Sequence, residues 1–468
     1  MKKRLIAVTL MTSLLTGCMV GPKYNRPVVK PPDTFRGSPT PPADPTSLAD
    51  LKWFEVFKDD QLQGLIRTAL VQNYDLREAV VRVDAARANL GITRSNQYPG
   101  ITVGANVTTL RNARNGSFAL PEGASQERNF GNVAINLLSF ELDVWGRLRR
   151  ATEAARADLL AAEENRKAVV TTLVGDVSSS YFNLLELDDE LEISKRTLAS
   201  RQESLRLIKV REQGGVATML DVRQGEQLVY NATQSIADIE RRLEQTENQI
   251  SLLLGKNPAE VARGSRLTAQ EQPPAVPPGL PSALLERRPD IRAAEQNLIA
   301  ANAIIGVAKA AYFPQINLTG FLGGQSNQLN SLFSGPSRTW SFVPQITQPL
   351  FVAGRLKSNV KLAEAQQQIA LVQYERVIQT AFREVSDSLV QYRKVREVSE
   401  QRQLLVTTLR DRSRLAYLRY RGGVDTLLNA LDADRDLFNA ELSLAQIRRD
   451  ELLSLVQLYK ALGGGWQQ

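Results

Sequence analysis

The sequence contains two copies of one long pattern, and a short Gly-Gly-Val stretch marks a turn in each copy. The stretch lies at residues 211–220 in the first copy and at residues 419–428 in the second, 208 positions later. Paired glycines permit the left-handed turn that ends many helices, and the threonine two positions after the valine can cap the next helix. Because long helical sequence flanks both stretches, each predicts the tip of a helical hairpin.

The duplication extends far beyond these tips. Residues 146–254 match residues 354–462 at the same offset of 208, without an insertion. Upstream, residues 75–99 match residues 290–314 at an offset of 215. The first copy therefore carries about seven more residues (215 minus 208) between its two predicted strands, where an exposed loop tolerates insertion best.

The N-terminus has the features of a bacterial lipoprotein signal. A cationic start precedes an apolar run over residues 5–15, which is too short to span a membrane but typical of a secretory signal. The Leu-Thr-Gly triplet directly before Cys18 matches the lipoprotein cleavage pattern, so we predict a signal peptide over residues 1–17 and a lipid on Cys18. An ordinary signal peptide with an incidental cysteine is the alternative. Met19 in the next position, rather than Asp, is consistent with sorting to the outer membrane.

Composition argues against several classes of protein. The net charge of +8 includes three cations in the first four residues, and the remaining charge is spread over mixed-sign helices, so no nucleic-acid partner is expected. The chain has no histidine and a single cysteine, so it lacks the usual general base, the commonest metal ligand and a disulfide. We therefore predict no catalytic residue, no metal site and no cofactor apart from the covalent lipid.

Between the N-terminus and the first tip, the sequence predicts an extended segment, a helix and two strands. The proline-rich stretch to about residue 45 favours a segment lying along other surfaces, with a flexible tether as the alternative. Alternating sequence after each helix indicates strands with one apolar face, and a change of phase predicts a bulge near Leu137. Pro344 and Pro349 weaken the last strand. The predicted helices cover about residues 60–97 and 282–312, and the predicted strands cover residues 101–108, 132–144, 316–322 and 340–350.

The helices that lead to the tips are too long for a compact domain. From Gly146 and Gly354 they run about 65 residues, on the order of 100 Å, and their apolar residues recur at steps of four and three, which predicts a coiled-coil seam. The return helices, over about residues 216–254 and 424–462, are shorter. Four strands of membrane-spanning length cannot close a barrel alone, so several chains would have to contribute strands. An ordinary soluble sheet is the alternative.

These features together resemble the TolC-like outer-membrane factor family, and within it the OprM-like lipoprotein branch. The resemblance covers the whole chain and includes Gly17-Cys18, the Gly-Pro-Lys-Tyr sequence at 21–24, the duplicated units, the Gly-Gly-Val tips and the ending at residues 458–466. It implies a mixed α/β membrane protein: a homotrimer with a twelve-stranded transmembrane β-barrel continued by a long periplasmic α-helical barrel. It also implies an outer-membrane, lipid-anchored channel that works with a periplasmic adaptor and an inner-membrane pump of the resistance-nodulation-division (RND) class to export small molecules such as drugs.

The predicted organisation of the chain follows from this resemblance. A signal peptide (1–17) precedes an extended part of an equatorial domain (18–60), the first repeat (61–255), a connector (256–281), the second repeat (282–463) and a short tail (464–468). The resemblance implies that the adaptor docks at the tips, on Gly214, Gly215, Val216, Thr218, Gly422, Gly423, Val424 and Thr426. The alternative is that the glycines only end the helices and contact no partner.

A gate is expected where the two copies differ. Asp432 and Arg435 follow the second tip, whereas the first copy has Gln224 and Gln227 at the same offset. Together with Leu428 the two charged residues share one helix face, and a solvated charged face is the simpler interpretation. The resemblance instead implies that this face constricts the channel. The predicted gate residues are Tyr420, Leu428, Asp432 and Arg435.

Other functions remain open at this stage. An exit duct for type I protein secretion and a metal-ion efflux duct would use the same architecture. A structural coiled-coil lipoprotein would explain the predicted lipid and the heptads, but not strands at the same point in both copies. A lipid-anchored periplasmic enzyme would need a cluster of reactive residues, and the sequence shows none.

Overall fold

The computed structural model describes residues 19–36, 47–114, 123, 125–270, 279 and 281–467. The predicted signal peptide and Cys18 lie outside these residues, as does part of the predicted connector. The chain forms two compact units. The strand unit comprises the described parts of Met1–Val28, Val83–Ala162 and Ala294–Tyr374, and the helical unit comprises those of Val29–Arg82, Glu163–Ala293 and Glu375–Gln468.

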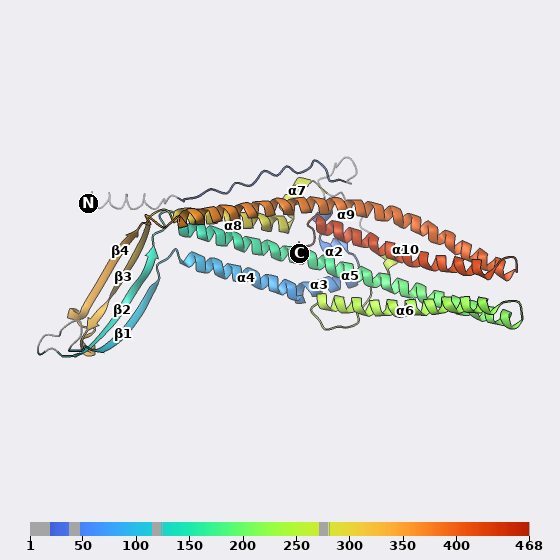
Figure 1. Cartoon of the computed structure of the whole chain (residues 1–468), viewed down its shortest axis with the longest axis horizontal. Coiled ribbons are helices and arrows are strands. Elements are labelled where there is room, and N and C mark those ends of the chain that lie inside the picture. Colours follow the sequence, from blue (N-terminus) through green and yellow to red (C-terminus); the bar gives the residue numbers. More distant parts are fainter. Residues whose placement is uncertain are drawn as a thin grey trace. The chain divides into compact units, whose positions relative to one another are not determined.

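The order of the elements repeats once along the chain (Figure 1). The first copy consists of α3 (Asp60–Gln72), α4 (Tyr74–Ser95), β1 (Ile101–Arg111), β2 (Glu127–Glu141), α5 (Arg147–Gln213) and α6 (Met219–Leu253). The second consists of α7 (Pro281–Arg287), α8 (Pro289–Ala310), β3 (Gln315–Ser326), β4 (Arg338–Thr347), α9 (Arg355–Arg421) and α10 (Leu427–Ala461). Short helices are η1 (Leu48–Asp50), α2 (Trp53–Val56), η2 (Leu267–Ala269), η3 (Leu329–Ser331) and η4 (Gly335–Ser337).

The long helices match the duplication in length as well as in position. Helices α5 and α9 have 67 residues each, and the return helices α6 and α10 have 35 each. The predicted hairpins are therefore confirmed. No helix in the described part of the chain combines the length and the apolarity that crossing a bilayer requires.

The single helix predicted over residues 60–97 is wrong, because Asn73 separates α3 from α4. Asn73 has a non-helical backbone conformation (ψ 134°), and its side-chain oxygen accepts a hydrogen bond from the N–H of Leu76 (2.9 Å). Its Nδ2 donates to the carbonyl oxygen of Leu253, the last residue of α6 (3.0 Å). The side chain thus caps one helix and satisfies the end of another. The apolar spacing continues through this break, so periodicity alone did not reveal it.

The helix predicted over residues 282–312 is divided at the equivalent position, where Arg288 separates α7 from α8. Pro289 follows Arg288, and a proline disfavours the helical conformation of the residue before it. Arg288 Nη1 donates to the carbonyl oxygen of Ala461, the last residue of α10 (3.0 Å). Both copies therefore bind the end of the return helix with a side chain from the break.

The strands form one antiparallel sheet in the order β1-β2-β3-β4. The bulge predicted near Leu137 is confirmed, because the register between β2 and β3 shifts between Leu137 and Phe140. Pro344 lies within β4, opposite Leu318, and the strand ends at Thr347 before Pro349. Each strand differs from its predicted bounds by several residues at one or both ends.

The first residues after Cys18 pack against the strand unit as an N-terminal strap (residues 19–26). The N–H of Val20 donates to the carbonyl oxygen of Trp145 (3.1 Å), and Tyr24 donates to Glu295 on α8 (3.2 Å). Gly21 has φ +103°, and a Cβ there would lie 2.5 Å from the Cα of Gly306. The strap is thus held along its length, and the flexible-tether alternative does not apply to it.

In the helical unit, Asp59 fixes the connector to α5. Its carboxylate accepts hydrogen bonds from the N–H groups of Leu62 (3.0 Å) and Ser265 (2.9 Å), from Gln270 Nε2 (2.8 Å) and from the Tyr181 hydroxyl (3.2 Å). Burial alone would raise the pKa of Asp59, but these hydrogen bonds together hold that pKa below its usual range. A single carboxylate therefore joins three separate segments of the chain.

Candidate functional site

One face of the sheet is apolar and exposed. Residues paired in register lie on the same face, and the row Val103, Ile135, Leu322 and Trp340 crosses all four strands. Large apolar residues on this face expose between 52% and 74% of their surface: Ile101, Val103, Val107, Ile135, Leu322, Trp340, Phe342 and Ile346. An exposed apolar patch that extends across four strands would be exceptional on a soluble monomeric protein. The face has the chemistry of a surface in contact with lipid.

The opposite face is mainly polar. The adjacent row consists of Thr102, Asn136, Phe321 and Ser341, of which only Phe321 is apolar. Polar and small residues continue along this face of the strands, including Asn106, Asn132, Asn317, Thr319 and Gln325. The alternation of apolar and polar residues is that of strands with lipid on one side and water on the other.

The predicted tips have the same backbone in both copies. Gly215 and Gly423 adopt φ of +74° and +72°. After α5 the N–H of Val216 donates to Arg211 O (2.9 Å), and after α9 the N–H of Val424 donates to Arg419 O (3.1 Å). These bonds, with the shorter turn closed by each glycine, form a Schellman motif that ends the helix. A Cβ on either glycine would meet no neighbouring atom within 4 Å, so the backbone conformation alone favours glycine.

The start of the return helix differs between the tips. Thr218 forms a capping box with Asp221, whose N–H donates to Thr218 Oγ1 (3.2 Å). Thr426 occupies the equivalent position but makes no side-chain cap bond. The neighbouring Asp425 instead accepts from the N–H of Thr426, the residue before the helix (2.8 Å), and pairs with Arg419 (3.0 Å). The capping role predicted for threonine is therefore confirmed at the first tip and wrong at the second.

The structure brings three of the four proposed gate residues together. Leu428, Asp432 and Arg435 lie on one face of α10; Leu428 and Arg435 are exposed and Asp432 is partly exposed. Arg435 Nη1 lies 3.2 Å from Asp432 Oδ1, within the same helix. Tyr420 lies apart from these three, on α9. Its ring is 4.6 Å from the guanidinium of Arg211 on α5, and it packs against an apolar cluster that joins the two tips.

A buried ion pair near the tips was not foreseen from sequence. Arg201 on α5 binds Asp434 on α10 at 2.7 Å, donates to the carbonyl oxygen of Leu228 on α6 (3.1 Å) and lies over the ring of Phe438 (4.8 Å). The side chains of Arg201 and Asp434 are 3% and 10% exposed. The pair joins the first hairpin to the second. Sequence spacing gives no signal for it, because the partners lie on different helices.

A carboxylate pair is buried on α5 further from the tips. Glu186 and Glu190 are 1% and 2% exposed and one helical turn apart. Glu190 accepts from Gln446 on α10 (2.7 Å) and pairs with Arg242 on α6 (3.1 Å), while Glu186 pairs with Arg449 on α10 (3.4 Å). Burial, together with the hydrogen bond and negative charge of Glu190, raises the pKa of Glu186 to about 8.

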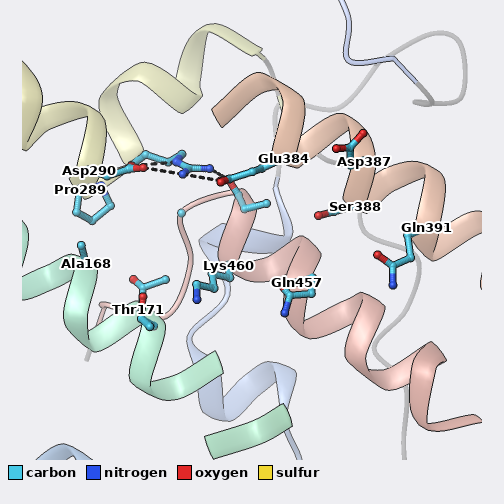
Figure 2. Close-up of a pocket in the computed structure, with 14 residues that line it drawn as sticks. Ala168, Thr171, Pro289, Asp290, Glu384, Asp387, Ser388, Gln391, Gln457 and Lys460 are labelled. Carbon is cyan, nitrogen blue, oxygen red and sulfur yellow. Dashed lines mark hydrogen bonds and ion pairs between the residues drawn. The ribbon is translucent and has the colours of Figure 1, made fainter. Parts of the chain in front are cut away.

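The helix junction at Arg288 borders a polar cavity of about 420 Å³ (Figure 2). Arg288 binds Asp290 (2.6 Å) and Glu384 on α9 (2.8 Å), as the dashed lines in Figure 2 show. Lys460 and Thr171 also line the cavity, and the Thr171 hydroxyl has no hydrogen-bond partner among the described residues. Within the described part of the chain, no three His, Cys, Asp or Glu side chains are placed to hold a metal ion. The cavity is a charged helix junction that sequence reasoning missed.

The chain matches a known protein family along both copies and is similar to several characterised sequences. The family described as outer membrane efflux protein matches residues 65–256 and 280–464. The probable efflux pump outer membrane protein TtgC of Pseudomonas putida is 38% identical over 473 residues, covering 100% of this chain and 97% of that protein. Outer membrane protein OprJ of Pseudomonas aeruginosa is 36% identical over 469 residues, covering 99% of this chain and 96% of that protein.

A solved structure has the same fold over nearly the whole chain. The open state of the MtrE outer membrane channel of Neisseria gonorrhoeae superposes with a TM-score of 0.86 at 32% identity, covering 96% of this chain and 99% of MtrE. The family resemblance inferred from the repeated units and tips is confirmed by these matches. The exposed apolar face of the sheet, the long paired helices and the similarity along both copies agree, and the chain belongs to the outer membrane efflux protein family.

Proposed function

We propose that three copies of this chain form the outer-membrane duct of a tripartite efflux pump of the RND class. The observation that carries the proposal is the two-faced sheet. Its outer strands, β1 and β4, have no further strand partner among the described residues, and open edges are not tolerated in hydrocarbon. Three copies would supply twelve strands and close the sheet with its apolar face outward and its polar face lining a water-filled channel.

The remaining parts of the chain would then have the following roles. The long helices of the two repeats, at 61–255 and 282–463, would form a periplasmic helical barrel. The segments at 18–60 and 256–281 would form an equatorial domain around these repeats. Residues 464–468 would be a tail. A lipid on Cys18 would anchor the protein to the outer membrane. The Gly-Gly-Val tips would dock a periplasmic adaptor, and an inner-membrane pump would supply the energy. We propose no catalytic activity, which agrees with an efflux family.

A matched pair of strand variants tests this function. Ile135→Arg places a charge on the apolar face, whereas Asn136→Arg places it on the polar face of the same strand. A lipid-facing arginine near the middle of a membrane costs about 2–4 kcal/mol per chain. We expect Ile135→Arg to abolish recovery of the trimer from outer membranes and Asn136→Arg to preserve it with altered conductance in planar bilayers. Equal behaviour of both variants would contradict the proposal.

We further propose that Leu428, Asp432 and Arg435 narrow the duct near its tip, with Tyr420 supporting the contact between the hairpins. Asp432→Ala with Arg435→Ala should raise single-channel conductance and admit large antibiotics in cells without a pump. Gln224→Ala with Gln227→Ala, at the equivalent positions of the first copy, is the matched control. If both double variants leave conductance unchanged while the trimer stays intact, the charged residues of α10 are only a solvated helix face.

A further inference from the structure

The apolar face of the sheet ends at a cation. Arg338 is paired with Gly324, two positions beyond the pair formed by Trp340 and Leu322, so it lies on the same face as Trp340. This is the end of the sheet at which the β3–β4 loop lies, away from the helices that precede and follow the strands. An exposed tryptophan followed by an arginine is the order of groups found where hydrocarbon gives way to lipid headgroups.

Arg338 borders an open pocket of about 530 Å³ formed by the ends of β3 and β4 and the loop between them. Apart from Pro336, the other lining residues carry hydroxyls or amides, including those of Asn327, Gln328 and Ser337 between the two strands. Arg338 is the only charged residue among the described residues that line the pocket. No acidic side chain in the described part of the chain lies within ion-pair distance of it. The pocket therefore presents one positive charge among uncharged hydrogen-bonding groups.

The loop that shapes the pocket is held in place by internal contacts. The Ser326 and Ser331 hydroxyls are 2.7 Å apart, and the Ser334 hydroxyl donates to the carbonyl oxygen of Ser331 (2.7 Å). Leu332 is 6% exposed, and a Cβ added at Gly324 would lie only 2.3 Å from its carbonyl oxygen. The loop thus folds back closely on β3, and glycine at position 324 permits this approach.

We propose that this pocket binds the phosphorylated sugar headgroup of a glycolipid in the outer leaflet. A guanidinium recognises phosphate by charge and by paired N–H donors, and the hydroxyls and amides match the hydroxyl groups of a sugar. The acyl chains of the same lipid would lie along Trp340 and Phe342 on the apolar face. The inference rests on the proposed function, because it requires this end of the sheet to face outward in the membrane.

The test measures glycolipid binding to the full-length, detergent-solubilised protein by native mass spectrometry. The probe is lipid A, a disaccharide lipid with two phosphates, and its dephosphorylated form is the comparison. Arg338→Gln should weaken binding of lipid A about tenfold and leave binding of the dephosphorylated form unchanged. Arg338→Lys should retain part of the affinity. Gly324→Ala should weaken binding while keeping the cation, because it displaces the loop.

Arg128→Gln is the matched control, because Arg128 is an exposed cation on the opposite face of β2, paired with Leu110. The proposal is overturned if Arg338→Gln binds lipid A as well as the unaltered protein does, or if Arg128→Gln loses as much affinity. It is also overturned if inorganic phosphate at equal concentration displaces the lipid, since the pocket would then bind a free anion. Conductance in planar bilayers is measured on the same samples. If no sample conducts, including the unaltered protein, the proposed channel function is refuted, whatever lipid binding shows.

Discussion

Helices α5 and α9 have the same length and the same place in the duplication, but their surroundings differ. Helix α5 bonds to α6 through Glu190 and Arg242 and to α10 through Arg196 and Glu441. Helix α9 bonds to α10 through Arg410, which shares the same Glu441. Figure 1 shows α5 between α6 and α10 in the helical unit, with α9 on the other side of α10. Near the tips α5 is therefore covered on two sides and α9 on one, whereas further from the tips α9 also binds Arg288 at the α7–α8 junction through Glu384.

The side chains follow this difference. Glu186 and Arg201 are buried in ion pairs on α5, while the residues 208 positions later are Lys394, which is exposed, and Leu409, which is partly buried. Helix α9 also exposes a series of large apolar residues: Leu362, Ile369, Val372, Val390, Val398, Leu404, Leu405, Leu415 and Leu418. The two copies thus share one backbone, whereas their side chains differ according to the helices that pack against each of them.

The largest expected effect of a substitution is at the buried ion pair of α5. Arg201→Ala leaves Asp434 buried without its partner and should lower the free energy of unfolding by about 3–5 kcal/mol. Leu409→Ala, at the equivalent position of α9, should lower it by only about 1–2 kcal/mol, because Leu409 is partly exposed. Urea unfolding of the solubilised protein, followed by circular dichroism, measures both. Equal losses would show that the two helices are not in different environments.

The helix junctions should show the opposite asymmetry, with the larger effect in the second copy and a smaller difference between the copies. Arg288→Ala removes the partner of Asp290, of Glu384 and of the carbonyl group that ends α10. It should lower the free energy of unfolding by about 3 kcal/mol, the low end for a broken ion pair, because both carboxylates are partly exposed. Asn73→Ala in the first copy removes uncharged hydrogen bonds and should cost about 1–2 kcal/mol. The shift in the thermal unfolding midpoint of each variant measures the difference. A larger shift for Asn73→Ala would reverse the comparison.

The buried carboxylate pair makes stability depend on pH. The pKa of Glu186 is about 8 in the folded chain and 4.5 is its usual value, so the folded chain holds this proton more tightly. The associated stability is fully present below about pH 4.5 and is lost as the pH rises to about 8. Glu186→Gln keeps the shape without the titration, so the fall in its unfolding midpoint between pH 5 and pH 8 should be smaller than in the unaltered protein. Parallel pH profiles would mean that Glu186 does not hold a proton.

The smallest effect is expected at the caps of the return helices. Thr218→Ala removes a capping box and should destabilise the first turn of α6 by about 1 kcal/mol. Thr426→Ala removes no cap bond and should change the first turn of α10 by much less. Amide hydrogen exchange in the two turns reports the difference directly. Similar acceleration in both turns would show that the cap geometry does not control these ends.

The sequence predicted the features that repeat and missed those that depend on contacts between distant segments. The tips, the long helices and the bulge near Leu137 follow from local chemistry: glycine conformation, apolar spacing and a change of strand phase. The break at Asn73 was missed because the apolar spacing continues through it. Pro289 could have revealed the equivalent break in the second copy. The pair formed by Arg201 and Asp434 could not be predicted, since many charged residues of these helices face water and spacing does not single out the buried ones.

The N-terminal strap sets an order of events during synthesis. The first residues after the predicted cleavage site pack against Gly306 and Glu295, which the ribosome adds more than half a chain later. While the first copy is being made, the strap can therefore bond to Trp145 and Arg150 but not to α8. It can pack onto α8 only after the second copy has been made. The contact with the first copy therefore precedes the contact with α8, because the two partners of the strap lie so far apart along the chain.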